Sequence, residues 1–417
     1  MCLFSSTYSA NNDMEMVFVQ TFFRHGDRAA LYDHFPISVE EWEEAAGGIG
    51  ELSPIGLQQT RKLGKALRER YISDLKWLSK TYKAKEIYVR STNVNRTIMS
   101  GNSVFSGMYT TAQSQNDGII SMIPVHVEDE PCGVTEKCVC KRKTEIETLR
   151  RNSTVFLKWF GNPQNIGFGM NISKWYNVSI EDTVLVPDSL TCQRIHFNDT
   201  LYAKAPWYNE EFYRASQEWY KPQKAQHAGV YGSEEPPIVN GIDVQAELRR
   251  LQIPMLAEVY DRAMMKFQCY RNPTNCSESV NNLKFFAYSS HDRTMFILMG
   301  LLGVEELVDT EVGWPDYTAT LVFENFVKNG TDDNYFRLLY RAHPFETTFQ
   351  VVTQKIKDCD NQEYCSMEVL RNITDTYKTD MDIDTMCNTP IQKSGNSQRN
   401  LLFLANTLIV SFAKHFV

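Results

Sequence analysis

Three apolar runs in this chain each end at a polar or charged cluster and are followed by a helical pattern. The runs are residues 16–23, 86–89 and 283–288, and they are rich in β-branched and aromatic side chains. Short apolar runs of this kind are typical of strands that are buried on both faces, as in the parallel sheets of α/β proteins. The pattern therefore predicts three strand–loop–helix units.

Apolar residues recur at helical spacing in two longer segments, residues 54–80 and 242–267. The repeated positions are Leu57, Leu63, Leu67 and Leu75 in the first segment and Val244, Leu248, Leu251 and Leu256 in the second. A helix with one apolar face can cover a sheet, so we expect both segments to pack on the predicted strands. Two further strands are predicted at residues 318–323 and 336–340.

Residues 115–240 differ in character from the segments on either side. They contain many turn residues, three cysteines within nine positions and a set of aromatic side chains, namely Trp175, Trp207, Tyr208, Phe212, Tyr213, Trp219 and Tyr220. We interpret this stretch as an inserted, mainly helical cap. Its aromatic residues are expected to form a core rather than a platform for a ligand.

The predicted fold class is α/β, with a mostly parallel sheet that is flanked by helices on both faces. The core is predicted to comprise residues 14–114 and 241–392, the smaller cap residues 115–240, and an apolar C-terminal tail residues 393–417. In open parallel sheets the ligand binds beyond the carboxyl ends of the strands. The clusters that follow the three apolar runs are therefore expected to meet at one site, where helix N-termini favour an anion.

The composition is that of an ordinary globular protein. Of the 417 residues, 42% are hydrophobic and 23% are charged, which excludes a disordered or fibrous chain. The net charge of −8 and the pI near 5.6 argue against nucleic acid as a partner and against a general attraction to anionic lipid. An anionic substrate must then be attracted by a local basic site.

The cluster after the first run has the sequence Arg24-His25-Gly26-Asp27-Arg28. A neutral imidazole can attack phosphorus, and planar guanidinium groups can bind phosphoryl oxygens in pairs and neutralise the charge that develops on them. The motif therefore favours a histidine nucleophile that acts on a phosphate. The alternative interpretation is a charged surface turn.

Ten cysteines and eight Asn-x-Ser/Thr sequons indicate an oxidising, secretory compartment. A zinc site is the weaker alternative, because Cys132, Cys138 and Cys140 lack both the C-x₂-C spacing and a nearby histidine pair. The six-residue spacing suggests that Cys132 pairs with Cys138. The sequons are at Asn95, Asn152, Asn171, Asn177, Asn198, Asn275, Asn329 and Asn372.

The two ends of the chain leave its route and attachment open. Residues 1–10 have no basic region and only a short apolar stretch, so a secretory signal is not seen there. Residues 401–413 are mostly apolar but fall short of the roughly 20 residues that span a bilayer. We keep two interpretations of this tail, a membrane or lipid anchor and a docked terminal helix.

Three motifs together resemble the histidine acid phosphatase family, which includes the prostatic and lysosomal acid phosphatases. The motifs are RHGDR at residues 24–28, YVRST at residues 88–92 and YSSHD at residues 288–292. Further similar stretches are LSPIGLQQ at residues 52–59 and NRTIM at residues 95–99. The resemblance covers most of the chain, from about residue 14 to residue 390.

The resemblance implies a role for each residue of the predicted site. His25 would be the nucleophile that forms a phosphohistidine, and Asp292 would protonate the leaving group and later activate water. The phosphoryl oxygens would be bound by Arg24, Arg28, Arg90 and His291. The substrate would be a small phosphate monoester, and the reaction would require no metal and no cofactor.

The resemblance also implies disulfide pairing, location and assembly. Cys359 would pair with Cys365 and Cys140 with Cys387, which leaves an odd number among Cys192, Cys269 and Cys276, while Cys2 would be free or removed. The protein would be extracellular, lysosomal or attached to the cell surface. Homodimers occur among the relatives, so a homodimer is a further expectation by analogy.

The sequence departs from the family pattern at three positions near the predicted site. Ala30 stands where the family has proline, and Asn93 and Asn95 stand where it has aspartates. These departures keep open the interpretation as a catalytically inactive, phosphatase-like binding glycoprotein. A phytase or inositol-polyphosphate phosphatase is the alternative among enzymes, and it needs a wider basic pocket than the scattered cations of residues 130–240 suggest.

Overall fold

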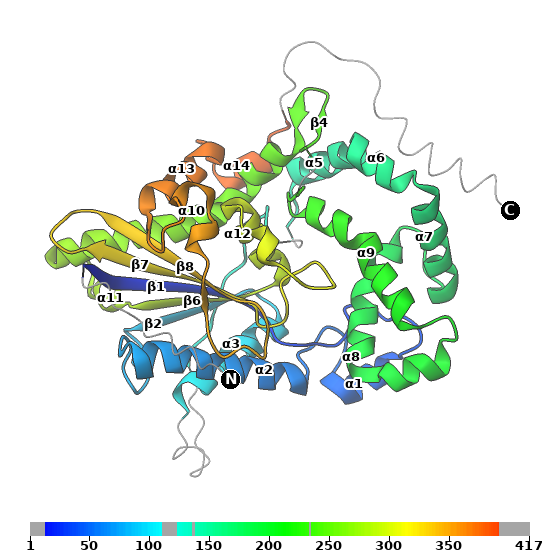
Figure 1. The fold of residues 1–417 in the computed structure, drawn as a ribbon, viewed down its shortest axis with the longest axis horizontal. Helices are drawn as coiled ribbons and strands as arrows, with labels where there is room; N and C mark the ends of the chain where they lie inside the picture. Colours follow the sequence, from blue (N-terminus) through cyan, green and yellow to red (C-terminus); the bar gives the residue numbers. More distant parts are fainter. Residues whose placement is uncertain (1–12, 111–122, 136–137, 233–234, 392–417) are drawn as a thin grey trace.

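The computed structural model describes residues 13–110, 123–135, 138–232 and 235–391 and is built around one large mixed sheet (Figure 1). The sheet has eight strands in the order β10-β8-β7-β1-β6-β2-β3, and β9 pairs with β8. Their bounds are β1 Met14–Arg24, β2 Ile87–Ser91, β3 His126–Val127, β6 Phe285–Ser290, β7 Thr320–Lys328, β8 Asn334–Arg341, β9 Gln350–Val351 and β10 Cys365–Ser366. A separate hairpin joins β4 Ile238–Val239 to β5 Ile242–Asp243.

The three predicted apolar runs form neighbouring parallel strands. β1 pairs in parallel with β6, β6 with β2, and β2 with β3. β7 runs antiparallel to β1, and β8 runs antiparallel to β7, so five of the strands share one direction. Every residue of β1 from Val17 to Arg24 is buried, because both faces of the sheet are covered. The α/β class predicted from the sequence is confirmed.

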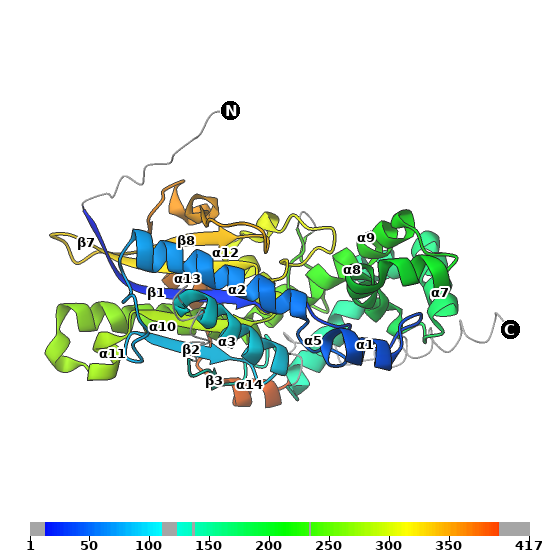
Figure 2. The same cartoon turned by 90° about the horizontal axis from the view of Figure 1, so that it is seen from below.

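Two apolar clusters cover the two faces of the sheet. On one face Phe23 packs with α2 Pro54–Arg68 and α3 Asn95–Tyr109. On the other face Phe22 packs with α10 Val244–Arg271 and α12 Asp292–Leu302, and α13 Met367–Tyr377 lies against α10. Successive strand residues point to opposite faces, which explains why neighbouring phenylalanines belong to different clusters. Figure 2, seen from the side of α2 and α3, shows both helices lying along the strands.

The helical periodicity of the sequence predicted two of these helices with small differences at their ends. The segment 54–80 begins as α2, whose N-cap is Ser53. The α-helix ends at Arg68, and a π-helical turn follows over Glu69–Asp74. The segment 242–267 is α10, which extends to Arg271. Gly64 lets α2 approach α3 closely, since a Cβ there would lie 1.9 Å from the Val104 carbonyl oxygen.

A helical region lies beyond the carboxyl ends of the parallel strands (Figure 1). Its helices are α5 Lys141–Arg151, α6 Thr154–Phe160, α7 Pro163–Tyr176, α8 Val186–Lys204 and α9 Glu210–His227. α6, α7, α8 and α9 share an apolar cluster that includes Leu190, Phe212 and Trp219, so the aromatic residues of this stretch do form a core. α5 packs instead in a cluster with α10, where Ile146 lies with Leu248. The remaining helices are α1 Val39–Ala46, α11 Glu278–Asn282 and α14 Ile383–Asn388.

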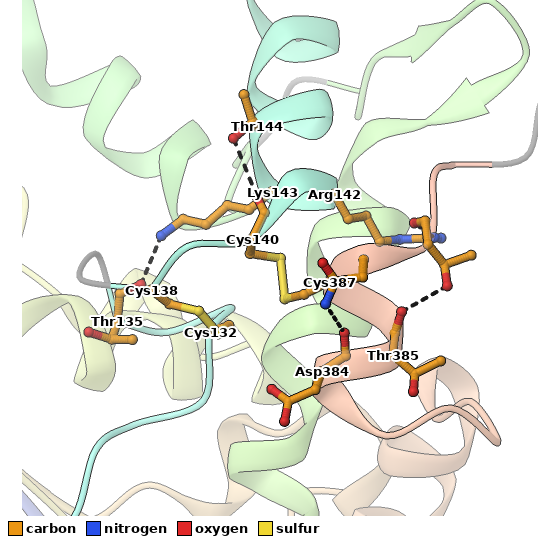
Figure 3. Close-up of a disulfide and its surroundings, with 12 residues drawn as sticks. Cys132, Thr135, Cys138, Cys140, Arg142, Lys143, Thr144, Asp384, Thr385 and Cys387 are labelled. Atoms are coloured by element: carbon orange, nitrogen blue, oxygen red, sulfur yellow. Dashed lines mark hydrogen bonds between the residues drawn. A yellow bond between two sulfur atoms is a disulfide. The ribbon is translucent and has the colours of Figure 1, made fainter.

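Four disulfides crosslink the described part of the chain. The pairings predicted for Cys132–Cys138, Cys140–Cys387 and Cys359–Cys365 are confirmed, and Cys269–Cys276 is the fourth. Figure 3 shows the first two near each other, with the second joining the start of α5 to α14. The sulfurs of Cys132, Cys138 and Cys387 lie within 4.8 Å of one another, but each belongs to a disulfide and is not a free thiolate ligand.

Some predictions fall on parts of the chain that the structure does not describe. Cys2, the start of the predicted cap and the tail 393–417 lie outside the described residues. Within the described ranges, no helix is both long and apolar enough to cross a membrane. The buried Cys192 is the odd cysteine that the sequence left without a partner.

Candidate active site

The ends of β1, β2 and β6 bring the three sequence motifs to one place. Arg24 lies opposite Ser290, and Ser91 lies opposite Ser289, in the parallel ladders. The ladder continues one step past the strand, since the His25 amide donates to the Ser290 carbonyl at 3.0 Å. All three strands point toward the helical region, and the loop that follows β1 contacts α8 through Arg28 and Asp188.

His25 is buried at the end of β1, and its surroundings fix its tautomer. Its Nδ1 lies 2.7 Å from the Gly26 carbonyl oxygen. A carbonyl oxygen only accepts hydrogen bonds, so Nδ1 carries the proton and Nε2 keeps a lone pair when the ring is neutral. Gly26 is required for this turn, because a Cβ there would lie 2.3 Å from the Gly56 carbonyl oxygen at the start of α2.

The charge state of His25 suits a nucleophile. Burial lowers the pKa of His25 well below its usual value, and the positive charges of Arg96, Arg24 and Arg28 lower it further. The imidazole is therefore neutral at mildly acidic pH. A neutral ring with a free Nε2 is the form that can attack an electrophile.

Arg24 connects residues 24–30, here called the nucleophile loop after the role predicted for His25, to the end of β6. Its guanidinium forms an ion pair with Asp292 at 2.8 Å and donates to the Pro315 carbonyl at 2.9 Å. The same guanidinium lies 4.2 Å from the centre of the Tyr317 ring, in a cation–π contact. Two separate segments of the chain, at Asp292 and at residues 315–317, therefore hold Arg24 in place.

Arg28 connects the nucleophile loop to the helical region. Its Nη2 donates to both carboxylate oxygens of Asp188 in α8, at 2.9 and 3.2 Å. Its Nη1 donates to the Ala29 carbonyl. Although burial acts against the charged form, Asp188 raises the pKa of Arg28 well above its usual value.

The loop that carries these residues is rigid although it has Ala30 in place of the family's proline. Ala30 is fully buried, and its carbonyl accepts from the Gly50 amide at 2.8 Å. The Ala29 amide donates to the Glu51 carbonyl at 3.0 Å. Packing and hydrogen bonds thus supply the restraint that a proline would give.

His291 and Asp292 begin α12 at the end of β6. The His291 ring centroid lies 5.6 Å from that of His25 in an edge-to-face arrangement, and its Nε2 is 2.9 Å from Thr92 Oγ1. Burial, together with the charge of Arg96, lowers the pKa of His291 to about 3. Burial alone would raise the pKa of Asp292, but the charges of Arg24 and Arg28 outweigh it and lower that pKa to about 2.

Arg90 has its guanidinium occupied by acidic groups. Nη1 donates to both oxygens of Glu258 in α10 at 2.8 and 2.9 Å, Nε pairs with Glu128 at 3.3 Å, and Nη2 donates to the Asp129 carbonyl. Its place opposite Tyr288 in the ladder puts it on the α10 face of the sheet. These contacts lend no support to the prediction that Arg90 binds phosphate.

Arg96, in the first turn of α3, is the arginine that sequence reasoning missed. Among the charged neighbours of His25 and His291 it exerts the largest effect on the pKa of each. Burial and the charge of Arg28 lower the pKa of Arg96 itself to about 10. Among the described residues no carboxylate forms an ion pair with it, and its buried Nε has no hydrogen-bond partner there. The signal was the stretch NRTIM, which matches the family.

Two further buried groups surround the site. Lys224 of α9 donates to the Val312 carbonyl at 3.1 Å, and burial lowers its pKa to about 8. Glu130 accepts from Thr294 Oγ1 at 2.6 Å, and burial raises its pKa to about 7. Neither residue belongs to a motif that the sequence analysis identified.

The charges of the site favour an anion over a metal cation. Arg24, Arg28 and Arg96 face Asp188 and Asp292, so the positive groups are in excess. The histidines that could ligate a metal lie among these guanidinium groups, which would repel a cation. Fixed N–H donors with excess positive charge form a cluster suited to a phosphoryl group.

A family model described as "Histidine phosphatase superfamily (branch 2)" matches residues 15–341. The chain belongs to the histidine phosphatase superfamily. The match spans all three motifs and the Arg96 segment of this phosphatase. The prediction that the chain is a histidine acid phosphatase, an enzyme that hydrolyses phosphate monoesters, is confirmed.

Known proteins match from about two thirds to nearly all of this phosphatase. A Caenorhabditis elegans protein that carries the name "putative acid phosphatase" is 35% identical over 421 residues, 96% of this chain and 94% of the relative. Human lysosomal acid phosphatase is 28% identical over 298 residues, 69% of this chain and 63% of the relative. The solved phytase of Citrobacter braakii has a TM-score of 0.59 at 13% identity, covering 89% and 99% of the two chains, and supports the fold alone.

Proposed function

We propose that this phosphatase hydrolyses small phosphate monoesters at acidic pH through a covalent phosphohistidine on His25. The observation that carries the proposal is the imidazole itself. Its Nδ1–H donates to the Gly26 carbonyl, its Nε2 carries a lone pair, and burial together with the positive charges around it keeps the ring neutral. An enzyme that forms a covalent intermediate replaces one difficult hydrolysis by two easier transfers.

Each transfer has a defined path for electrons and protons. In the first, His25 Nε2 attacks phosphorus, the bond from phosphorus to the ester oxygen breaks, and Asp292 gives its proton to the departing oxygen. In the second, the Asp292 carboxylate takes a proton from water, whose oxygen attacks phosphorus as the P–N bond breaks. Inorganic phosphate leaves, and both residues return to their starting states.

We assign the phosphoryl oxygens to Arg24, Arg28 and Arg96, with His291 as a further contact. Arg96 replaces Arg90 in this assignment because Arg90 is bound by Glu258 and Glu128. The three guanidinium groups would stabilise the charge spread over the phosphoryl oxygens in the transition state. No metal or cofactor has a role in these steps.

The ionisation of Asp292 links the mechanism to acidic pH. In the ligand-free site Arg24 and Arg28 keep the Asp292 carboxylate ionised. A bound phosphoryl group brings negative charge and competes for Arg24, so it raises the pKa of Asp292. Below pH about 6 a phosphate monoester carries one remaining proton, which supplies the proton that Asp292 needs.

Hydrolysis of 4-nitrophenyl phosphate between pH 4 and pH 8, with and without a chelator, tests this proposal. The parent should be active at acidic pH and indifferent to the chelator, His25→Ala should be inactive, and Asp292→Asn should be strongly impaired. Loss of the parent's activity on chelation would contradict the metal-free mechanism. An inactive parent would support the interpretation as a binding protein.

A phosphatase for inositol polyphosphates is the second candidate, because Lys224 adds a buried cation from α9. The charges of Asp188 and Asp292 act on Lys224 against the burial that lowers its pKa, so Lys224 belongs to the same group of interacting charges as Arg24 and Arg28. A substrate with several phosphates would use such an additional cation. Turnover of phytate with a higher kcat/KM than that of 4-nitrophenyl phosphate would favour this candidate.

We further propose a secretory location, either extracellular, lysosomal or surface-attached. The four disulfides, the eight sequons and the lysosomal acid phosphatases among the relatives support it. A mobility shift after enzymatic deglycosylation of secreted protein tests the glycosylation. Detergent partitioning of the full chain against a version that ends at Arg399 tests the anchor.

The division into a core of residues 14–114 and 241–392 and a cap of residues 115–240 also remains a proposal. The apolar cluster formed within residues 159–220 supports a separate helical unit. β3, at residues 126–127, pairs with β2 in the core sheet, so the support begins after that strand. Limited proteolysis should cut between the two parts before it cuts within either. Sedimentation of the purified protein tests whether two chains associate.

A further inference from the structure

We propose that His196, in α8, is a positioning residue of the phosphatase reaction that acts through Asp27 on the nucleophile loop. This inference rests on the proposed function of His25 and Arg28. Asp27 lies between these two residues in the chain. The bond from His196 Nε2 to Asp27 Oδ1 is 2.6 Å long and joins segments 169 residues apart in the sequence.

The Asp27 side chain is fully buried and acts as an acceptor. Ser53 Oγ accepts from the Gly56 amide at 3.0 Å, so its proton is directed to Asp27 Oδ1 at 2.5 Å. The same oxygen accepts from His196 Nε2. The other carboxylate oxygen, Oδ2, has no hydrogen-bond partner among the described residues. A buried carboxylate with so few partners depends strongly on each of them.

The main chain of Asp27 fixes the loop against α2. Its amide donates to Gln59 Oε1 at 2.8 Å, and its carbonyl accepts from the Ser53 amide at 3.0 Å. These bonds come from the core. The side-chain bond to His196 ties Asp27 to the helical region, and with the contacts of Arg28 to Asp188 and Cys192 it helps to set how the loop lies relative to α8.

One face of α8 contacts the loop at three successive helical positions. Asp188, Cys192 and His196 are spaced by four residues, which places them on the same side of a helix. Asp188 and Cys192 both contact the Arg28 guanidinium. α8 thus holds Arg28 and Asp27 together, on either side of one peptide bond, and a shift of this loop moves His25 as well.

Replacement of His196 by leucine tests the proposal. His196→Leu should lower kcat for 4-nitrophenyl phosphate about 10- to 100-fold, since small misplacements of reacting groups have effects of this size. It should also weaken inhibition by orthovanadate. His196→Gln keeps an N–H donor at a similar reach and should recover much of the loss. The double variant with Asp27→Asn should be no worse than the more impaired single variant.

Gln193→Leu is the matched control. Gln193 is buried on the same helix and donates to the His34 carbonyl at 2.6 Å, but it contacts neither Arg28 nor Asp27. It should lose thermal stability comparable to that of His196→Leu while kcat changes less than about threefold. Equal losses of kcat in both variants, or unchanged kcat in His196→Leu beside an active parent and an inactive His25→Ala, would overturn the proposal. An inactive parent would instead refute the proposed function.

Discussion

The molecule contains two clusters of buried arginines, one with a structural role and one at the candidate active site. In the antiparallel half of the sheet, Arg70 and Arg337 both bind the fully buried Glu324, at 2.7 and 2.8 Å. Arg337 also pairs with Glu363, and Tyr71 donates to Glu324. Each positive charge has a nearby carboxylate, so this cluster needs nothing from outside.

The cluster at the ends of the parallel strands is not balanced in this way. Arg24 and Arg28 each have one carboxylate, Arg96 has no ion-pair partner among the described residues, and the buried Nε atoms of all three have no hydrogen-bond acceptor there. Burial lowers the pKa values of His25 and His291, and the positive charges of this cluster lower them further. Unmet donors and excess positive charge distinguish a ligand site from a structural one.

Loss of the nucleophile is expected to have the largest effect on the catalytic cluster. His25→Ala should lower kcat by about 10⁴-fold or more, because no other group can form the covalent intermediate. The thermal stability of the variant at acidic pH should not fall. In the parent, folding must keep His25 uncharged, which makes folding less favourable, and alanine removes this penalty. Steady-state kinetics and thermal denaturation check both expectations, and substantial residual turnover would exclude the phosphohistidine.

The structural cluster should respond in the opposite way. Glu324→Gln leaves Arg70 and Arg337 buried with a neutral partner, which should destabilise the fold by about 3 kcal/mol or more. The kcat/KM of the folded variant should stay within about twofold of the parent's, because the two clusters share no contact. Urea denaturation and kinetics measure the two quantities. A large loss of kcat/KM in the folded variant would show that the clusters are coupled.

Two arginines on the same chain segment sharpen the comparison further. Arg96→Met should lower kcat/KM about 10²- to 10³-fold, as expected for the loss of a donor to the transition state. Arg90→Met, which removes an arginine already bound by carboxylates, should lower it less than tenfold, or by under about 1.4 kcal/mol. The reverse order would restore the role that the sequence motif suggested for Arg90.

This pair of arginines also shows how far the sequence could lead. The three strand ends, the nucleophile, Arg24, Arg28, His291 and Asp292 were all predicted to meet, because strand periodicity and the motifs place them in the chain. The choice between Arg90 and Arg96 depends on which face of β2 and which turn of α3 points to the site. The apolar pattern does not reveal that orientation.

The sequence did not predict the side chains that α8 and α9 contribute to the site, for a different reason. Asp188 and His196 come from a region 160 or more residues after the nucleophile loop, and no periodicity links them to it. Their role arises from tertiary packing of the helical region on the strand ends. The same holds for Glu130 and Lys224, whose burial was not visible in the sequence.

Glu130 gives a predicted effect on the pH dependence of stability and not on catalysis. Its pKa is raised by burial from an ordinary value near 4.5 to about 7 in the folded protein. A carboxyl with a raised pKa favours folding fully below pH 4.5, and its contribution is lost as the pH rises through 7. Glu130→Gln should therefore lose less stability than the parent between pH 4.5 and 7, by at most about 3 kcal/mol. Denaturation measured at both pH values checks this, and an equal loss of stability in the parent and in Glu130→Gln would contradict it.

The central claim is that His25 and three arginines from distant parts of the chain bind one phosphoryl group. The crystal structure of the protein with orthovanadate tests it most directly. The account predicts vanadium bonded to His25 Nε2, with the vanadate oxygens bound by Arg24, Arg28 and Arg96 and with Arg90 still paired to Glu258. Vanadate bound away from His25, or held by Arg90 in place of Arg96, would contradict it.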